Sequence, residues 1–139
     1  MKSALLVLAC VALLALAACG NQAAPAAVGD AVTGKALFEQ KTIGEDNVAG
    51  CATCHSVEPD SKIVGPSLAG IATDAADAFK ETGYEGTAKN ASEWLREQIV
   101  SPELEVGEEF QSGVMPATYG TELTQKQLDD IVAYLLTLK

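Results

Sequence analysis

One short segment, Cys-Ala-Thr-Cys-His at residues 51–55, constrains this chain more than any other feature of its sequence. The spacing lets a tight turn present both sulfurs on one side, with the imidazole directly after them. His55 is the only histidine among the 139 residues, and the two other cysteines, Cys10 and Cys19, lie near the N-terminus. The fold must therefore be built around a single site that uses two thiols and one imidazole.

This pattern is the attachment signature of a c-type haem. Cys51 and Cys54 are predicted to bond the two vinyl groups at one edge of the porphyrin. The adjacent His55 is predicted to reach the iron from one face. The sequence therefore predicts one covalently bound haem c as the cofactor.

Three other uses of the two thiols fit the sequence less well. A thioredoxin-like redox pair shares the cysteine spacing but is expected within a βαβ pattern, which the sequence does not show. A zinc site needs four ligands, and after removal of the signal segment only Cys19 and carboxylates remain to complete it. A disulfide between Cys51 and Cys54 suits an oxidising compartment, but it leaves His55 unexplained.

The first 18 residues have the pattern of a secretory signal. Lys2 precedes an apolar run from Ala4 to Ala18. A membrane-spanning helix needs about 20 apolar residues, and polar residues end this run before it reaches that length. Its end, Leu-Ala-Ala-Cys at residues 16–19, resembles the bacterial lipoprotein signal, which implies cleavage before Cys19 and a lipid on its sulfur. Without lipidation, Cys19 is simply a residue beside a secretory cleavage site.

The sequence therefore divides into a signal peptide (residues 1–18), a lipidated Cys19 with a flexible linker (19–29) and one folded domain (30–139). The linker is rich in Ala and has no periodic apolar face, and ten flexible residues span roughly 15 to 20 Å. We expect the lipid to hold the domain close to the extracytoplasmic, periplasmic face of a bacterial membrane.

The first predicted helix covers residues 31–41, with Asp30 as its N-cap. Its expected buried face comprises Val32, Ala36 and Leu37, with Gly34 and Phe38 beside them. A glycine in mid-helix costs about 1 kcal/mol relative to alanine. We therefore expect another element to approach Gly34 closely.

Two further helices complete an all-α prediction. Asn90 with Glu93 resembles a capping-box variant and starts a helix that ends before Pro102, whereas a Thr-x-x-Gln box at Thr124 starts the last helix. The expected buried residues are Trp94, Leu95, Gln98 and Ile99 in the second helix, and Leu128, Ile131, Val132, Leu135 and Leu138 in the last. No strand is predicted, and residues 42–50, 56–66, 73–89 and 101–121 are predicted loops. Because aromatic residues make up only 5% of the chain, part of the core is expected not to be protein.

From about Val28 to Lys139, the chain resembles the class I c-type cytochromes. In that family the histidine of the motif is the fifth iron ligand, and a methionine in the loop before the last helix is the sixth. The resemblance implies His55 and Met115 as the ligands, with three main helices and long loops around one haem. As alternatives, Met115 is an ordinary core residue, or a lysine takes the sixth position.

Two other segments carry the resemblance. Gly65 and Pro66, followed by Leu68, resemble the family's Gly-Pro-x-Leu segment, in which the proline carbonyl accepts the N–H of the proximal imidazole. Gly34 and Phe38 resemble the positions where the first helix crosses the last, with Tyr134 as the implied aromatic partner.

Three more side chains have open roles. Trp94 and Tyr119 could line the haem or bond a propionate, or be ordinary core and surface aromatics. Arg96, the only arginine, could pair with a carboxylate, although a solvated helix face explains it more simply.

A haem with both axial positions filled leaves no place for a substrate, so we expect a one-electron carrier without enzyme activity or a small-molecule substrate of its own. A net charge of −10, which becomes −11 without the signal peptide, argues against a nucleic-acid partner. It favours redox partners with basic docking faces, although acidity could equally serve solubility alone.

The expected partners are subunits of a respiratory or photosynthetic electron-transfer complex, with a tethered shuttle as the second role. The whole chain looks like the monohaem cytochrome subunits of quinol-oxidising assemblies such as alternative complex III. A different class of function is a haem enzyme or gas sensor with a labile Met115 ligand. A lipoprotein without haem that serves only interactions is a third alternative.

Overall fold

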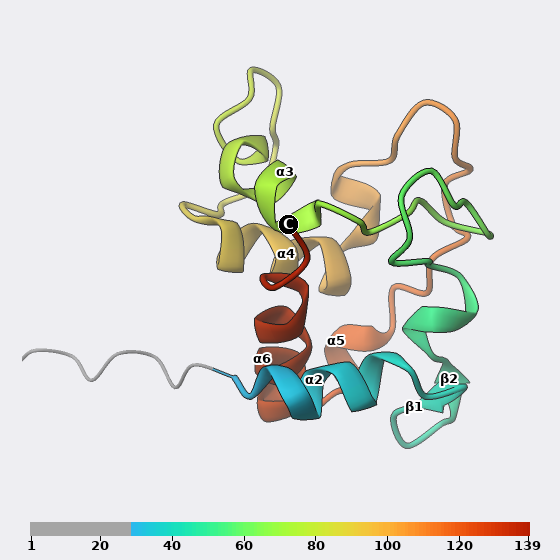
Figure 1. Cartoon of the computed structure of the whole chain (residues 1–139). Coiled ribbons are helices and arrows are strands. Elements are labelled where there is room, and N and C mark those ends of the chain that lie inside the picture. The colour runs from blue at the N-terminus through green and yellow to red at the C-terminus, as the bar shows by residue number, and fades with distance from the viewer. Residues whose placement is uncertain (1–28) are drawn as a thin grey trace, which may run out of the picture.

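The computed structural model describes residues 29–139, so the predicted signal peptide, Cys19 and most of the predicted linker lie outside the described residues. The elements are α2 (Ala31–Phe38), β1 (Thr42–Ile43), β2 (Val48–Ala49), the 3-10 turn η1 (Cys51–Thr53), α3 (Ile71–Ala78), α4 (Ala91–Val100), the 3-10 turn η2 (Pro102–Leu104), α5 (Tyr119–Glu122) and α6 (Gln125–Leu135). Figure 1 shows helices joined by long loops, with only a small hairpin, which confirms the all-α fold. None of the helices within residues 29–139 has the length and hydropathy to cross a bilayer.

The crossing of α2 and α6 is the most extensive contact between elements (Figure 1). A Cβ added at Gly34 would lie 1.8 Å from the carbonyl oxygen of Asp130, so only glycine allows the two backbones to approach this closely. The rings of Phe38 and Tyr134 pack beside that point, with centroids 5.4 Å apart and planes tilted by 59°. The predicted close approach at Gly34 is confirmed, and so is Tyr134 as the aromatic partner of Phe38.

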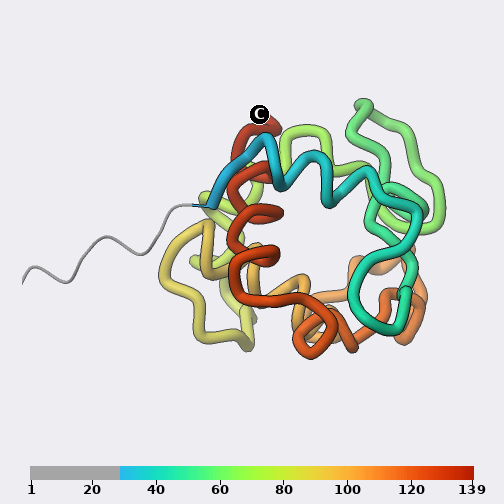
Figure 2. Tube along the Cα trace, turned by 90° about the horizontal axis from the view of Figure 1, so that it is seen from below, coloured from blue at the N-terminus to red at the C-terminus, as the bar shows by residue number. Residues whose placement is uncertain are grey.

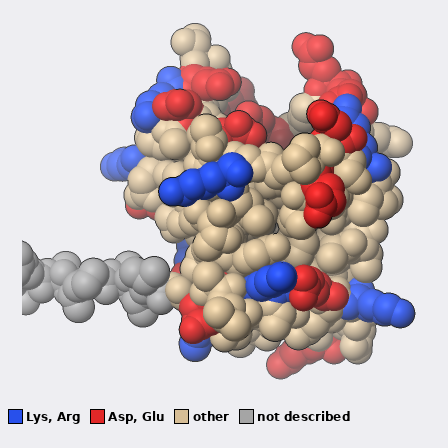
Figure 3. Space-filling model, in the orientation of Figure 1, with Lys and Arg blue, Asp and Glu red and all other residues tan. Residues whose placement is uncertain are grey.

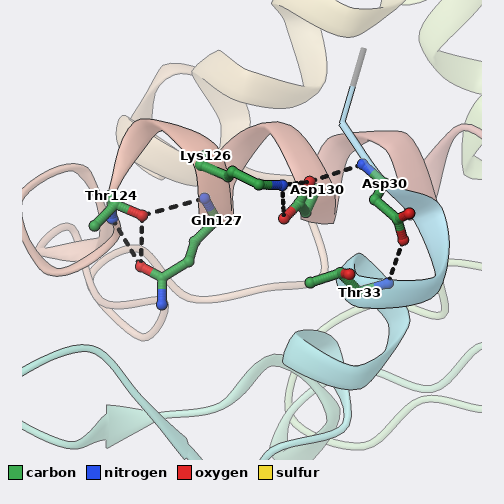
Figure 4. A network of polar contacts seen from close by, with 6 residues as sticks. All are labelled: Asp30, Thr33, Thr124, Lys126, Gln127 and Asp130. Carbon is green, nitrogen blue, oxygen red and sulfur yellow. Dashed lines mark hydrogen bonds and ion pairs between the residues drawn. The ribbon is translucent and has the colours of Figure 1, made fainter. Parts of the chain in front are cut away.

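A polar network also joins these two helices (Figure 4). Asp30 caps α2 by accepting the Thr33 N–H at 2.7 Å, and its own N–H donates to the Asp130 carboxylate of α6 at 2.7 Å. Lys126 donates to the same carboxylate at 2.8 and 2.9 Å. Asp130 is only 1% exposed, so its charge is held by these bonds within the helix crossing. The sequence pattern predicted the cap but not the link to Asp130.

Side-chain caps start the other two main helices where they were expected. Thr124 and Gln127 form a complete capping box at α6, as Figure 4 also shows. At α4, Asn90 accepts the Glu93 N–H at 3.0 Å. The Glu93 carboxylate accepts from the Lys89 N–H at 2.8 Å rather than from the N-cap amide, so this second bond differs from that of a true capping box.

The buried face of α2 differs from the prediction. Val32 is 82% exposed and Ala36 is exposed, whereas Gly34, Leu37 and Phe38 are buried. The helix turns this face inward because Gly34 must meet the backbone of α6. The helix also ends at Phe38, three residues before the predicted Lys41. In α6 the predicted stripe is buried as far as Leu135, and Leu138 is half-buried beyond the helix end.

Two short strands and two short helices lie wholly or mostly in segments that were predicted to be loops. Strands β1 and β2 pair antiparallel, Thr42 with Ala49 and Ile43 with Val48, but two residues each are too few to show an alternating pattern. Helix α3 begins after Gly70 without a side-chain cap and buries only alanines, so it lacks the usual signals of a helix. Helix α5 has four residues and likewise no side-chain cap.

Candidate functional site

The cysteine motif forms a tight turn directly after the hairpin. Gly50 precedes it, and a Cβ there would lie 1.8 Å from the carbonyl oxygen of Gln40, so glycine lets the motif start against the chain that follows α2. The N–H groups of Cys54 and His55 both donate to the Cys51 carbonyl, at 3.1 and 2.9 Å. These bonds place the two sulfurs and the imidazole within one turn, as the spacing predicted.

Both thiols are free and half-buried, and both line the same cavity as His55. Burial raises the pKa of the Cys51 thiol to about 11, so this thiol is neutral at ordinary pH. A neutral thiol at the wall of an apolar cavity is poorly suited to metal coordination, which requires the thiolate.

His55 is oriented by the segment that was expected to hold it. Its Nδ1 lies 2.9 Å from the carbonyl oxygen of Pro66. Because a carbonyl can only accept, Nδ1 carries the proton and Nε2 keeps its lone pair free for a metal. A Cβ added at Gly65 would lie 2.6 Å from Cε1 of the ring, so glycine makes room for the imidazole. Burial lowers the pKa of His55, while the bond to Pro66 opposes this shift, and the ring is held neutral.

A cavity of about 530 Å³ opens beside these residues in the middle of the domain. In Figure 2, α2 (blue) and α6 (red) lie on two sides of this region. The green segment that follows the cysteine motif and the orange segment that precedes α6 lie on the other sides. Cys51, Cys54, His55 and Met115 all lie on its wall. Much of the rest is apolar and includes Phe38, Leu68, Leu95, Ile99, Ile131 and Leu135. A second, more open depression of about 460 Å³ near the C-terminal Lys139 contains none of these four residues.

The donors and the cavity fit a covalently attached haem. Ligand sites commonly measure roughly 300 to 1,000 Å³ and have mainly apolar walls with a few directed polar groups. Here two thiols, a neutral imidazole and a thioether line one such cavity. Within residues 29–139, no three side chains among His, Cys, Asp and Glu gather as a metal site, so the described domain offers no zinc cluster.

The aromatic residues with open roles line the same cavity but give their polar hydrogens to the protein. The Trp94 indole N–H donates to the Glu105 carboxylate at 3.2 Å, and the Tyr119 hydroxyl donates to the Ala49 carbonyl at 2.6 Å. Burial raises the pKa of Tyr119 to about 12, so this hydroxyl stays a donor. Tyr119 thereby ties the segment after Met115 to the hairpin before the motif.

Arg96 does not lie on a purely solvated face. It forms an ion pair with Asp129 of α6 and donates to the side chain of Gln125 at 3.3 Å. The pair joins α4 to α6 outside the cavity, so the role of Arg96 is structural.

Glu103 is a residue that sequence reasoning missed. Its carboxylate accepts the N–H of Gly113 at 2.9 Å and the hydroxyl of Ser112, two and three residues before Met115. Hydrogen bonds hold the pKa of Glu103 below its usual value, the Ser112 hydroxyl contributing most. No sequence signal could have found this contact, because a bond between a glutamate and a loop amide ten residues away follows no motif.

Comparison with known proteins agrees with this geometry. No curated protein matches the chain. The family model described as cytochrome c matches residues 31–139, which is nearly the whole described domain. The matched region contains the turn of two cysteines and a histidine as well as the crossing of α2 and α6. The chain therefore belongs to the cytochrome c family, as an electron-transfer protein with a covalently bound haem c.

Proposed function

We propose that this protein is a one-electron carrier whose haem is bonded to Cys51 and Cys54 and ligated by His55 and Met115. The observation that carries the proposal is that all four residues line the same cavity. The Pro66 carbonyl leaves Nε2 of His55 free for the iron. Met115 is the only thioether of the described domain, and it is half-buried against the core.

This arrangement favours electron transfer over substrate chemistry. When bound, the haem supplies one-electron exchange between the ferric and ferrous states. Axial thioether ligation and burial of the site stabilise the reduced form and raise its potential. The chain's own residues fix the imidazole through Pro66 and exclude water with the apolar wall of the cavity. Neither axial position is then left for a substrate.

Replacement of the methionine tests this ligation. Met115→Leu keeps the volume of the side chain but removes its sulfur. We expect the oxidised variant to lose the weak far-red absorption band that reports a bond between methionine and ferric iron, to bind cyanide faster and to have a lower potential. Val32→Ala changes an exposed residue of α2 that does not line the cavity and should leave all three unchanged. A wild-type protein that lacks the band and binds cyanide rapidly would instead be a haem enzyme or gas sensor.

The proposal places the domain at the periplasmic face of a bacterial membrane through a lipid on Cys19. The support is the apolar run of residues 4–18, which ends in small residues before Cys19 and is followed by a linker too short to let the domain move far. We expect the mature protein to begin at a lipid-modified Cys19, as mass spectrometry of its N-terminal peptide can show. Cys19→Ala should release a haem-loaded protein into the soluble fraction, and retention of this variant on membranes would contradict the anchor.

The proposed docking face is the acidic segment of residues 101–118, which runs along the cavity. It contains four glutamates, no lysine and no arginine, while Val106 and Val114 are exposed within it. In Figure 3 acidic side chains gather at the upper right, over this part of the molecule. An apolar patch beside negative charge matches a partner that presents lysines or arginines around its own apolar centre.

Salt dependence tests this docking face. Electron transfer to a small cationic metal complex should slow as salt is added, and transfer to an anionic complex should become faster. The charge reversal Glu108→Lys should weaken both trends, whereas Glu81→Lys, beyond the end of α3, should change them less. Rates that do not depend on ionic strength would contradict the electrostatic part of the proposal.

As its partner assembly we propose a membrane complex that oxidises quinol, of the alternative complex III type. The support is the short linker together with the resemblance of the whole chain to the monohaem subunits of such assemblies. Purification from membranes at high salt separates the two roles. A fixed subunit should be recovered with its complex, whereas a tethered shuttle should be recovered alone.

A further inference from the structure

We infer that Glu103 is a positioning residue that holds the loop of Met115 in place and so keeps the methionine on the iron. The inference rests on the ligand role proposed for Met115. Glu103 lies in η2, which follows α4 and begins with the buried Pro102. A short turn anchored in this way gives the Glu103 carboxylate a fixed base from which to bind the loop.

Glu103 contacts the loop at two residues, which lie nine and ten positions after it in the chain. The hydroxyl of Ser112 and the N–H of Gly113 both donate to the Glu103 carboxylate, one to each oxygen. Within residues 29–139, these are the only hydrogen bonds in which residues 111–117 take part. The segment that contains Met115 therefore has one polar attachment, and Glu103 supplies it.

The backbone on both sides of Met115 is restricted, so the contact with Glu103 also restricts the position of the Met115 side chain. Gly113 has φ +80°, in the left-handed region that favours glycine, so its N–H must point in a defined direction for the turn to form. Pro116 fixes φ on the other side of Met115. Downstream, the Tyr119 hydroxyl anchors the chain to the Ala49 carbonyl at 2.6 Å. Glu103 and Tyr119 thus hold the two ends of the segment.

A hydrogen bond to an ionised carboxylate is stronger than one between neutral groups. Loss of this pair of bonds frees one end of the segment to move away from the cavity, because only the Tyr119 anchor and the apolar packing of Met115 then restrain it. Loosening the loop should therefore increase the fraction of time for which the sixth position is open.

Four variants of the full-length, haem-loaded protein separate this role from that of a mere surface charge. Glu103→Ala removes both bonds, and Ser112→Ala removes one of them. Glu103→Gln removes the charge but keeps a carbonyl oxygen that can accept from Gly113. Glu108→Ala removes a charge from the same loop, and Glu108 makes no hydrogen bond in the described part of the chain. The measurements are the far-red band of the oxidised protein and the rate of cyanide binding.

We expect Glu103→Ala to weaken the far-red band and to speed cyanide binding by roughly three- to tenfold, as the loss of charge-assisted bonds predicts. Ser112→Ala should show a smaller increase. Glu103→Gln, which keeps only a neutral acceptor for Gly113, should lie between the wild type and Glu103→Ala. Glu108→Ala should stay within about twofold of the wild type, since both bonds of Glu103 survive in it.

The outcomes distinguish this inference from the proposed function. A wild-type protein without the far-red band overturns the Met115 ligation, and the role of Glu103 falls with it. If the wild-type protein has the band and the Glu103→Ala variant has the same band and the same rate of cyanide binding, only the role of Glu103 is overturned. If Glu108→Ala speeds cyanide binding as much as Glu103→Ala does, the effect belongs to the surface charge of the loop, and the inference is also overturned.

Discussion

At the scale of single residues, the glycines beside the haem site carry sharp constraints. Gly65 has no space for a side chain, because its Cβ would lie 2.6 and 2.9 Å from Cε1 and Nδ1 of His55. The second distance involves the atom that donates to Pro66. Any side chain at residue 65 must therefore push the imidazole away from its acceptor or move the loop.

We predict that Gly65→Ala destabilises the haem-loaded protein by about 1 to 3 kcal/mol, as overpacking of a tight site does. Because the bond to Pro66 makes the imidazole a better donor, its loss should also raise the potential. Denaturant unfolding and a redox titration measure the two effects. A variant with wild-type stability and potential would show that the ring does not depend on this contact.

The motif residues of the site could be predicted from the sequence, whereas a contact between distant loop residues could not. Cys51, Cys54 and His55 were predicted because covalent attachment demands a fixed spacing, and the turn that they form confirms the local geometry. The contact of Glu103 with Gly113 could not be predicted, because nothing in a sequence specifies which loop amide a glutamate meets.

At the scale of elements, the crossing of α2 and α6 depends on the missing Cβ of Gly34. Helix propensity alone predicts that Gly34→Ala stabilises α2 by about 1 kcal/mol. The structure predicts the opposite sign, because the new Cβ would lie 1.8 Å from the Asp130 carbonyl oxygen. We expect a loss of about 2 to 4 kcal/mol, at or above the usual cost of overpacking, as the backbones are forced apart.

The free energy of unfolding in denaturant measures this effect. Gly120→Ala provides the matched control, since its Cβ in α5 would meet only ordinary contacts, at 3.4 Å or more. That variant should be neutral or slightly stabilised. If Gly34→Ala behaves as Gly120→Ala does, then the close approach does not limit the packing of the two helices.

The polar link at the same crossing predicts a dependence on pH. The ammonium group of Lys126 and, next, the Asp30 N–H hold the pKa of the Asp130 carboxyl below its usual value of 3.8. The pKa of Asp30 is lowered in the same way, chiefly by the Thr33 N–H. Because both pKa values are lower in the folded state, the stabilisation is fully present above about pH 5 and is lost as pH falls through the folded pKa values.

Asp130→Asn should therefore reduce stability near neutral pH and flatten the acid limb of the stability curve, while Asp74→Asn should leave that limb unchanged. Asp74 is an exposed carboxylate in α3 that makes no side-chain hydrogen bond within residues 29–139. Denaturant unfolding from pH 7 down to about pH 3 provides the measurement. An unaltered acid limb in Asp130→Asn would assign the acid sensitivity to other groups.

The helices that could be predicted from the sequence are those whose first residues carry a side-chain cap. Polar caps at Asp30, Asn90 and Thr124 located the starts of the three main helices. Helix α3 was missed because Gly70 offers no side-chain cap and its buried face consists of Ala75 and Ala78. The rotation of α2 was also missed, because Val32 fits an apolar stripe by pattern, whereas the contact at Gly34 turns it to solvent.

At the scale of the whole molecule, the haem site continues the protein core. The buried residues of the helices pack together on one side of a cavity of about 530 Å³, and several of them, such as Phe38, Ile131 and Leu135, also line it. At about 24 cal/mol per Å³, a dry cavity of this size would cost on the order of 13 kcal/mol, which is as large as the entire stability of a typical domain. The few large side chains of the sequence are sufficient only because the cofactor fills this space.

The corresponding prediction concerns the protein without its haem. Cys51→Ala with Cys54→Ala removes both covalent attachments without changing the residues that cap the helices. We expect this double variant to lose helical circular dichroism and to show no cooperative thermal transition, because water or collapse must replace the cofactor. Cys19→Ala, which removes a thiol outside the domain, should keep the cooperative transition of the haem-loaded protein. A cooperative transition in the double variant at the temperature of the wild type would mean that the crossing of α2 and α6 suffices for folding, and that the haem serves electron transfer alone.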